Sequence, residues 1–395
     1  MRSVGTVVRG IRTPIIKEND DLAKIVVDSL LQAKENEGFE FNDRDIVSIT
    51  EAVVGISEGN FATLDEIAQD IKNKMNSDHL GVVYPILSRN RFSVLLSAIA
   101  RSTKKITLLC SYPSDEVGND ILYEEDLIKN NVNISSDIIT EEEYKAKYGH
   151  FKHLFTGVNM YEIYKELVNK EGCEFEMVWA NKPEVILNYT KDVIACDIHS
   201  RFKTKERLLA CGANKVLMLS EILNNSVNGS GYNPTYGLLG SNRATAERVK
   251  LFPRTGQELV EKIQKLLLEK TGKKIEVMVY GDGAFKDPVG GIWELADPVV
   301  SPAYTSGLEG SPNELKLKYL SENDFKDLHG EDLNKAMREA IKAKDSNLKG
   351  KMSTQGTTPR RYTDLIGSLC DLTSGSGDKG TPVVFIQGYF DNYAD

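Results

Sequence analysis

Short β-branched segments alternate with amphipathic helical segments along much of this 395-residue chain, and this alternation restricts the fold more than any other feature. Residues 46–49 and 275–279 are strand-like runs, whereas residues 20–33 carry apolar side chains at helical spacing. The strand-like pattern recurs in residues 106–110 and 193–196. Strands that alternate with helices are typical of α/β folds, so we expect an α/β protein.

Composition and charge exclude several classes of protein. The chain carries 49 basic and 58 acidic side chains, and its formal charge of −9 argues against a nucleic-acid binder, which needs a basic face. No apolar run approaches the ~20 residues that cross a bilayer, and the first residues lack the apolar core of a signal peptide. The five cysteines are widely spaced and form no CxxC pair, as expected of reduced thiols. We therefore expect a cytoplasmic protein that binds neither nucleic acid nor membrane.

The most clearly patterned stretch runs from residue 255 to residue 283. Thr255 and Glu258 have the spacing of a capping box, which satisfies the free N–H groups where a helix starts. Apolar residues then recur at helical spacing up to Gly272, which is well placed to end the helix. The strand-like residues 275–279 follow, and Gly281-Asp282-Gly283 predicts a turn at the carboxyl end of that strand.

Asp282 in this turn is the first candidate for a catalytic or metal-binding residue. Open α/β sheets bind ligands where their strands end, and flanking glycines let a phosphate approach the backbone. Acidic residues continue beyond the turn, at Glu294, Asp297 and Glu309. Hard cations such as Mg²⁺ take oxygen ligands and are often shared with substrate phosphates. Asp–Gly is equally the chemistry of an ordinary turn, so both interpretations stay open.

A second candidate is the glycine-containing segment 237–242, which ends in Gly240, Ser241 and Asn242. Backbone N–H groups in such a loop, together with a hydroxyl and an amide, can hold a phosphate or a ribose. The segment is neither a GxxxxGK[ST] loop nor a GxGxxG fingerprint. A plain connecting loop is the alternative interpretation.

Two expected helix starts carry arginines beside hydroxyl residues. A helix that begins near Ser88 and a second one that begins near Pro359 would present free N–H groups to an anion. Arginine side chains there could add charge-assisted hydrogen bonds, although solvated arginines are also common at such positions. The candidate residues for a substrate anion are Arg89, Arg91, Arg360 and Arg361.

Five segments, in sequence order, carry a resemblance to one family. They are residues 10–22 (GIRTPIIKENDDL), 42–59 (from NDRDIV to SEG), 236–242 (YGLLGSN), 251–283 (from LFPR to YGDG) and 378–388 (DKGTPVVFIQG). Together they resemble the γ-glutamyl ligases that extend the tail of the deazaflavin coenzyme F-420. The match covers about half of the chain, and this long form resembles a divergent bacterial branch of that family.

The resemblance implies an amide ligase that depends on GTP, or on ATP, and on Mg²⁺ or Mn²⁺. It implies a homodimer that adds glutamate to an acidic small molecule. By resemblance, Asp282 is an acidic metal ligand, and it and Lys286 are the catalytic candidates. Gly283 and the three residues at 240–242 would contact the nucleotide, and Glu294, Asp297 and Glu309 are further metal candidates.

Two departures from the family pattern weaken the expected metal site. Leu239 stands where the family has an aspartate ligand, and a leucine cannot coordinate a metal. Residues 281–286 (GDGAFK) replace the family's SDTFGR, so a threonine hydroxyl is lost and Lys286 replaces an arginine. Either neighbouring acidic residues rebuild the site, or the site is degraded and the protein is a non-catalytic nucleotide or phosphometabolite sensor.

We expect a ligase-like core made from both ends of the chain, with a second α/β domain inserted into it. The expected parts are residues 1–75 (N-terminal core), 76–230 (inserted α/β domain), 231–310 (core with the nucleotide and metal motifs), 311–358 (charged surface excursion) and 359–395 (C-terminal return to the core).

Overall fold

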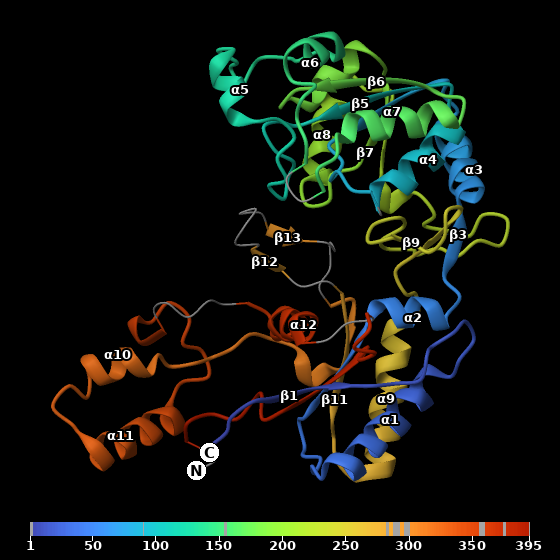
Figure 1. Ribbon diagram of the computed structural model, residues 1–395. Helices are drawn as coiled ribbons and strands as arrows, with labels where there is room; N and C mark the ends of the chain where they lie inside the picture. The colour runs from blue at the N-terminus through green and yellow to red at the C-terminus, as the bar shows by residue number, and fades with distance from the viewer. Residues whose placement is uncertain are drawn as a thin grey trace.

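The computed structural model describes residues 3–89, 91–153, 156–281, 284–286, 293–295, 301–354, 360–373 and 377–394, with the backbone alone for 284–286 and 293–295. Its described part has two lobes, each built around a five-stranded sheet, with a small sheet between them (Figure 1). Helices and strands combine in both lobes, so the expected α/β fold class is confirmed.

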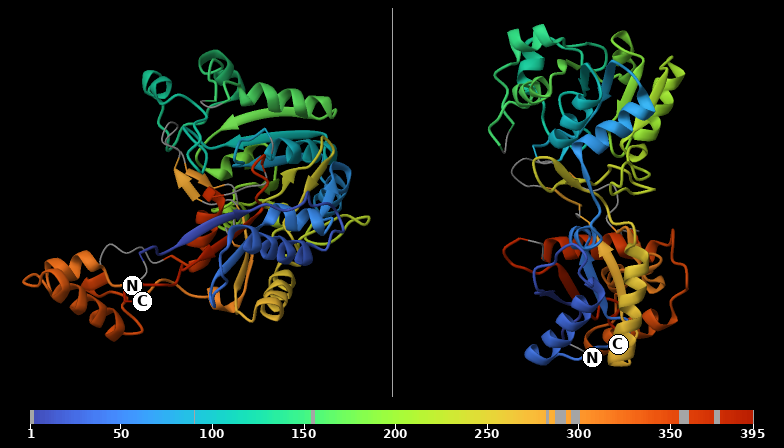
Figure 2. Two further views of the ribbon diagram at one scale, coloured as in Figure 1. Left: turned by 60° about the horizontal axis from the view of Figure 1, so that its bottom comes forward. Right: turned by 90° about the vertical axis from the view of Figure 1, so that its right-hand side faces the viewer.

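The first sheet combines strands from both ends of the chain and is mixed. Its order is β1 (Val7–Ile11), β15 (Val383–Gln387), β2 (Ile46–Thr50), β11 (Glu276–Tyr280) and β14 (Ala303–Tyr304). Strands β2 and β11 are parallel, whereas every other neighbouring pair is antiparallel. The two chain ends lie side by side because β1 pairs with β15 (Figure 2).

Alternating side chains give the first sheet two apolar faces. Val47 and Ile49 face helices α1 (Leu22–Glu37) and α9 (Gly256–Thr271). Ile46, one residue along, faces the opposite side and helix α12 (Tyr362–Thr373). Both faces are therefore covered. The chain leaves β2 directly into helix α2 (Glu51–Ser57).

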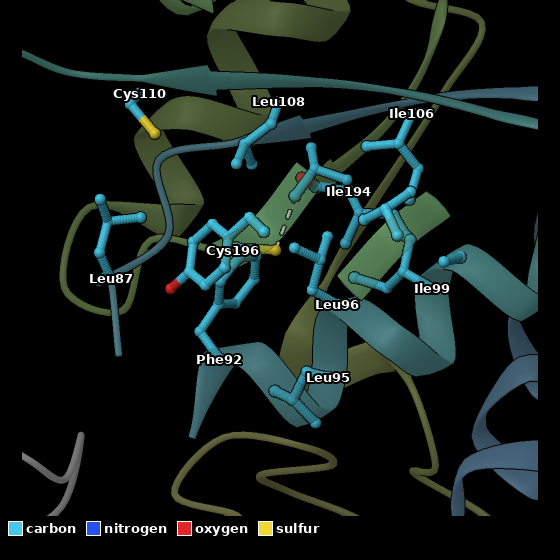
Figure 3. Close-up of a cluster of buried hydrophobic side chains, with 14 of the residues drawn as sticks. Leu87, Phe92, Leu95, Leu96, Ile99, Ile106, Leu108, Cys110, Ile194 and Cys196 are labelled. Carbon is cyan, nitrogen blue, oxygen red and sulfur yellow. Dashed lines mark hydrogen bonds between the residues drawn. The ribbon is translucent and has the colours of Figure 1, made fainter. Parts of the chain in front are cut away.

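The second sheet is entirely parallel and comes from one continuous stretch, residues 79–218. Its order is β6 (Glu174–Trp179), β5 (Lys105–Cys110), β4 (His79–Val83), β7 (Asp192–Ala195) and β8 (Lys215–Met218). One face packs on α3 (Leu64–Met75), α4 (Phe92–Ser102) and α7 (Met160–Lys170), and the other on α8 (Arg201–Ala210) and the 3₁₀ helix η1 (Pro183–Asn188). Figure 3 shows the α4 side of this core, where Leu96 and Ile99 meet Ile106, Leu108 and Ile194.

Smaller elements complete the chain. The sheet between the lobes contains β3 (Phe61–Thr63), β10 (Arg248–Lys250) and β9 (Asn242–Arg243), and a separate hairpin joins β12 (Ala284–Lys286) to β13 (Trp293–Leu295). The remaining helices are α5 (Glu124–Lys129), α6 (Glu141–Lys147), η2 (Leu219–Glu221), η3 (Ser306–Leu308), α10 (Leu317–Glu322), α11 (Gly330–Ala343) and η4 (Met352–Thr354). Helices α10 and α11 extend to one side of the first sheet (Figures 1 and 2).

The expected helix at residues 255–271 and its glycine stop are present, but the capping box is not. Gly272 adopts the left-handed conformation that ends α9, as predicted. The hydroxyl of Thr255 makes no capping bond to its own helix. It donates instead to Oε1 of Glu58, 2.6 Å away, and the same oxygen accepts from the Thr255 N–H. The capping-box prediction was wrong because a carboxylate distant in sequence occupies this helix start.

Candidate functional site

The candidate site lies where the two parallel strands of the first sheet end. Thr50, the last residue of β2, is the register partner of Tyr280, the last residue of β11. Carboxyl ends of neighbouring parallel strands meet at one edge of a sheet, which is where open α/β sheets bind ligands. Gly281 is buried at this edge. The two leading candidates that follow it, Asp282 and Gly283, lie outside the described residues.

A buried ion pair stands at the same edge. Nζ of Lys250 lies 2.5 Å from Oε2 of Glu51, and the two side chains are only 8 % and 6 % exposed. Glu51 begins α2 immediately after β2, whereas Lys250 ends β10 in the small sheet. A buried charge is tolerated when it is paired, so the two residues hold the small sheet against the edge of the first sheet.

The nucleotide-binding candidates lie beside this ion pair. Asn242 is the register partner of Lys250 across β9 and β10. Ser241 precedes it, is 4 % exposed, and its Oγ has no hydrogen-bond partner among the described residues. Gly240 has a φ of +70°, and an added Cβ would lie 1.6 Å from the ring of Phe252. Only glycine fits there, so packing against Phe252 alone explains why this residue is a glycine.

Leu239 is a core residue in the structure. Its side chain is 1 % exposed and belongs to the large apolar cluster of the second lobe, together with Leu238. Tyr236 packs against the same cluster. The position that holds an aspartate ligand in the family pattern is therefore filled by apolar packing, and it offers no oxygen to a metal.

The other acidic and lysine candidates are spread over two places. Lys286 and Glu294 lie on the β12–β13 hairpin, in adjacent register pairs, and their side chains are outside the description. Asp297 lies outside the described residues. Glu309 follows η3, whose Gly307 N–H donates to Glu276, the first residue of β11. Glu309 is thus placed toward the end of β11 opposite to Gly281.

Arg360 and Arg361 accompany Glu309 rather than the β2–β11 edge. Both are exposed and directly precede α12, whose first N–H donates to the carbonyl of Gly310. A hydrogen bond from Tyr304 to Glu309 raises the pKa of Tyr304, and the nearby charge of Arg361 opposes that rise. These arginines are therefore brought together with one metal candidate and not with the nucleotide candidates.

Arg89 and Arg91 stand at the start of α4 in the second lobe, after the carboxyl end of β4. The helix begins at Phe92 and its N-cap is Arg91, not the expected Ser88, although Oγ of Ser88 accepts from the Phe92 N–H at 2.8 Å. A third arginine joins this helix start: Nη2 of Arg243, next to Asn242, lies 3.4 Å from Oγ of Ser93. Through this contact the helix start that carries Arg89 and Arg91 lies near the nucleotide candidates of β9.

Sequence patterns did not indicate the Glu51–Lys250 pair. The partners are 199 positions apart, and neither belongs to a local motif. Glu51 directly follows a buried strand, which is the one local signal that could have marked it. Arg243 was missed for a similar reason, because its partner Ser93 is 150 positions away.

The described residues do not complete a metal site. Within this part of the chain no three His, Cys, Asp or Glu side chains gather in a way that could hold a metal ion. Mg²⁺ often takes only one or two protein carboxylates and completes its shell with water and substrate phosphates. A site that uses Asp282 and nucleotide phosphates fits this chemistry, whereas an all-protein cage among the described residues does not.

An α/β protein with buried polar groups at the carboxyl edge of a parallel strand pair has the layout of a small-molecule enzyme or ligand-binding protein. The chain belongs to the F420-0:Gamma-glutamyl ligase family, whose model matches residues 10–388, so the resemblance of the five segments is confirmed. The family's activity is that of a ligase for glutamate. A comparison with individual curated proteins gave no significant match. No helix of the described chain is both long and apolar enough to cross a membrane.

Proposed function

We propose that the protein is a nucleotide- and divalent-metal-dependent ligase that joins glutamate, or another amino acid, to an acidic small molecule. One observation carries the proposal. Family-like segments from three parts of the chain meet at one edge. Asn242 is the strand partner of Lys250, and Lys250 forms an ion pair with Glu51. Thr50, which precedes Glu51, is the strand partner of Tyr280. Asp282 follows Tyr280 by two residues. This meeting supports one shared site for nucleotide and acceptor.

The chemistry would proceed in two transfers. The γ-phosphoryl group of GTP or ATP passes to a carboxyl group of the acceptor, which becomes an acyl phosphate, and the nucleoside diphosphate leaves. The α-amine of glutamate then attacks the activated group, an amide bond forms, and phosphate leaves with the amine proton going to solvent. Mg²⁺ or Mn²⁺ held by Asp282 would neutralise phosphate charge when bound.

The chain's own residues would bind and orient the reactants. The backbone N–H of Gly240, the hydroxyl of Ser241 and the side-chain amide of Asn242 would hold the nucleotide phosphates, with the ammonium of Lys250 beside them. The Ser241 N–H already donates to the carbonyl of Leu238. Lys286 on the neighbouring hairpin would add a second positive charge. Arg89 and Arg91 would bind the acidic acceptor through charge-assisted hydrogen bonds. We expect a homodimer, as the family resemblance implies, and a cytoplasmic protein, as the composition indicates.

Leu239 favours a second candidate function. A buried leucine at the place of a metal ligand is compatible with a protein that keeps a nucleotide pocket and has lost catalysis. Such a protein would be a nucleotide or phosphometabolite sensor. It would bind the nucleotide without releasing phosphate.

Calorimetry with GTP and ATP, each with and without Mn²⁺, tests the part that both functions share. We expect tighter binding of one nucleotide with the metal, and at about 100 times the dissociation constant the fold should gain about 2.7 kcal/mol by linkage. Failure to bind any nucleotide under either condition would exclude both functions. Phosphate release with glutamate and a metabolite extract then separates the ligase from the sensor.

The variant Asp282→Asn tests the metal assignment. The amide keeps the shape of the side chain but removes the charge that a hard cation requires, so the metal-dependent gain in affinity should disappear. Asp28→Asn, an exposed carboxylate on α1, is the matched control. Full metal dependence in the Asp282 variant would make Asp282 an ordinary turn residue.

A further inference from the structure

The parallel sheet of the second lobe has a point where its chain order reverses. From β4 the chain moves outward through β5 and β6, and it then returns to place β7 and β8 on the other side of β4. The loops after β4 and β7 therefore leave the sheet on opposite sides of this point, which is where open α/β sheets bind ligands. The N–H of Cys196, just after β7, donates to the carbonyl of Val83 at 2.8 Å.

A buried carboxylate with an unused oxygen lies at this point. Asp197, two residues beyond β7, is 1 % exposed. Its Oδ2 accepts hydrogen bonds from the hydroxyls of Ser200 at 2.8 Å and Thr204 at 2.6 Å, in and just before the first turn of α8. Its Oδ1 has no hydrogen-bond partner among the described residues. A buried oxygen left unpaired costs about 1–3 kcal/mol, so this atom needs an explanation.

A second buried polar atom close by is also unused. Nε of Arg201, the first residue of α8, makes no hydrogen bond to any described residue, although Nη1 of the same guanidinium donates to the carbonyl of Ile198. Asp197 and Arg201 are four positions apart, so an unpaired acceptor and an unpaired donor lie close together in the sequence. Burial raises the pKa of Asp197, and the hydroxyls of Thr204 and Ser200 oppose that rise.

The start of α8 already holds an anion that belongs to the protein. Glu116, from the loop after β5, accepts from the backbone N–H groups of Ile198 and His199, the latter at 3.1 Å. Oγ of Ser200 lies 3.4 Å from the same carboxylate. These two N–H groups lie in the loop just before Ser200, the N-cap of α8, and successive loop N–H groups can bind a phosphate or a carboxylate. The Glu116 carboxylate occupies the place that a ligand anion would take.

We propose that the start of α8, at the reversal point between β4 and β7, binds a small molecule that carries a phosphate next to hydroxyl groups, and that Glu116 occupies the phosphate position until this ligand displaces it. The N–H groups of Ile198 and His199 and the Arg201 side chain would bind the phosphate. Asp197 Oδ1 would accept from a ligand hydroxyl. The site does not depend on the proposed ligase activity, since its binding needs no nucleotide.

Binding of three probes to the full chain, measured by calorimetry, tests the proposal. We expect ribose 5-phosphate to bind more tightly than inorganic phosphate, and unphosphorylated ribose not to bind. Glu116→Gln removes the competing internal charge, so both phosphate probes should bind at least about tenfold more tightly, since charged acceptors bond about twice as strongly as neutral ones. Glu174→Gln, a carboxylate at the amino end of β6, is the matched control and should leave the affinities unchanged.

A purely structural role for Glu116 would give a different result, because its loss would lower stability without raising either affinity. That outcome would overturn the proposal. Asp197→Asn supplies an independent check and should shrink the preference for ribose 5-phosphate over inorganic phosphate. If these variants fail to fold, hydrogen exchange on the wild-type chain decides. Ribose 5-phosphate should slow exchange at the amides of Ile198 and His199, and unchanged exchange there would refute the site.

Discussion

The two large sheets are assembled from different parts of the chain. The first sheet joins strands from residues 7–11 to residues 383–387, and its assembly must close very long loops. The second sheet comes from residues 79–218 alone and connects its strands through nearby helices. The family-like segments lie mainly in the first lobe and in the joint between the lobes. The stretch that forms the parallel sheet, residues 79–218, holds no such segment, yet its strand order is the clearer indication of a binding site.

The two lobes differ in what they contribute: the first carries most of the residues shared with the family, and the second carries candidate residues for binding an anion. The first lobe and the joint bring together Thr50, Glu51, Lys250 and Asn242, which fits a shared core of the family. The second lobe contributes Arg89 and Arg91 from one loop and Asp197 from another, all near carboxyl strand ends. We therefore expect the first lobe to determine the reaction and the second lobe to determine which anion is bound.

The largest expected effect concerns the joint between the lobes. Lys250→Met leaves Glu51 buried next to an apolar side chain, and breaking a buried pair in this way costs about 3–5 kcal/mol. Urea unfolding of the variant measures this loss. Lys262→Met, whose partner Asp21 is 56 % exposed, is the control and should cost less than about 1 kcal/mol.

Hydrogen exchange on the Lys250 variant shows whether the two lobes are separate units. Amides of β11 should lose protection before amides of β5, because Lys250 joins the small sheet to the first lobe. Equal loss in both strands would mean that the lobes unfold as one cooperative unit, and the comparison above would fail.

The second expected effect is steric and lies in the nucleotide-binding candidate. Gly240→Ala combines a left-handed backbone with a Cβ placed 1.6 Å from the Phe252 ring, so we expect a loss of about 2–4 kcal/mol. Gly272→Ala has nearly the same φ, +69°, and no atom within 4 Å of the new Cβ. It should cost only about 1 kcal/mol. Similar losses in the two variants would show that Gly240 is required by its backbone angle alone.

Local chemistry explains which parts of the fold were predictable. The glycine that ends α9 and the bond from the first N–H of α4 to the Ser88 hydroxyl each depend on a few neighbouring residues, and the structure has both. The Thr255 capping box failed although its spacing was correct, because Glu58 reaches that helix start from another part of the fold. A local pattern describes one way to satisfy a helix start and cannot exclude a distant competitor.

The candidate site was predictable only in part, for the same reason. Asn242 and the strand that precedes Asp282 were identified from local residues, and the structure places both at one edge. The Lys250–Glu51 pair depends on a contact between segments 199 positions apart, which no local spacing encodes. Whether Asp282 binds a metal stays a prediction.

The third expected effect tests the role of the second lobe in binding the acceptor. Arg89→Ala and Arg91→Ala should each weaken binding of the acidic substrate about ten- to a hundredfold, since a charge-assisted bond contributes about 1.5–3 kcal/mol. Nucleotide affinity, measured by calorimetry in parallel, should not change. Arg207→Ala on α8, which pairs with Glu184, is a control within the same lobe. Loss of nucleotide affinity in the Arg89 variant would contradict the division of roles between the lobes.

The smallest expected effect is a pH dependence confined to the second lobe. His79 begins β4, and its Nε2 lies 2.9 Å from Oγ1 of Thr107. Burial lowers the pKa of His79 below its ordinary value of 6.5, and the charge of Lys105 adds to this effect. The folded state therefore resists protonation more than the unfolded state does. The contribution of His79 is fully present above pH 6.5 and decreases as the pH falls through the lowered pKa.

Urea unfolding at about pH 7.5 and about pH 5.5, on either side of the ordinary histidine pKa, measures this contribution. The wild-type chain should lose more unfolding free energy between the two conditions than His79→Gln, because glutamine does not titrate. Hydrogen exchange should locate the difference in β4 and β5 rather than in β2 and β11, since His79 lies in β4 and its ring bonds to Thr107 of β5. An equal pH dependence in both proteins would show that His79 is protonated as readily in the folded chain as in the unfolded one.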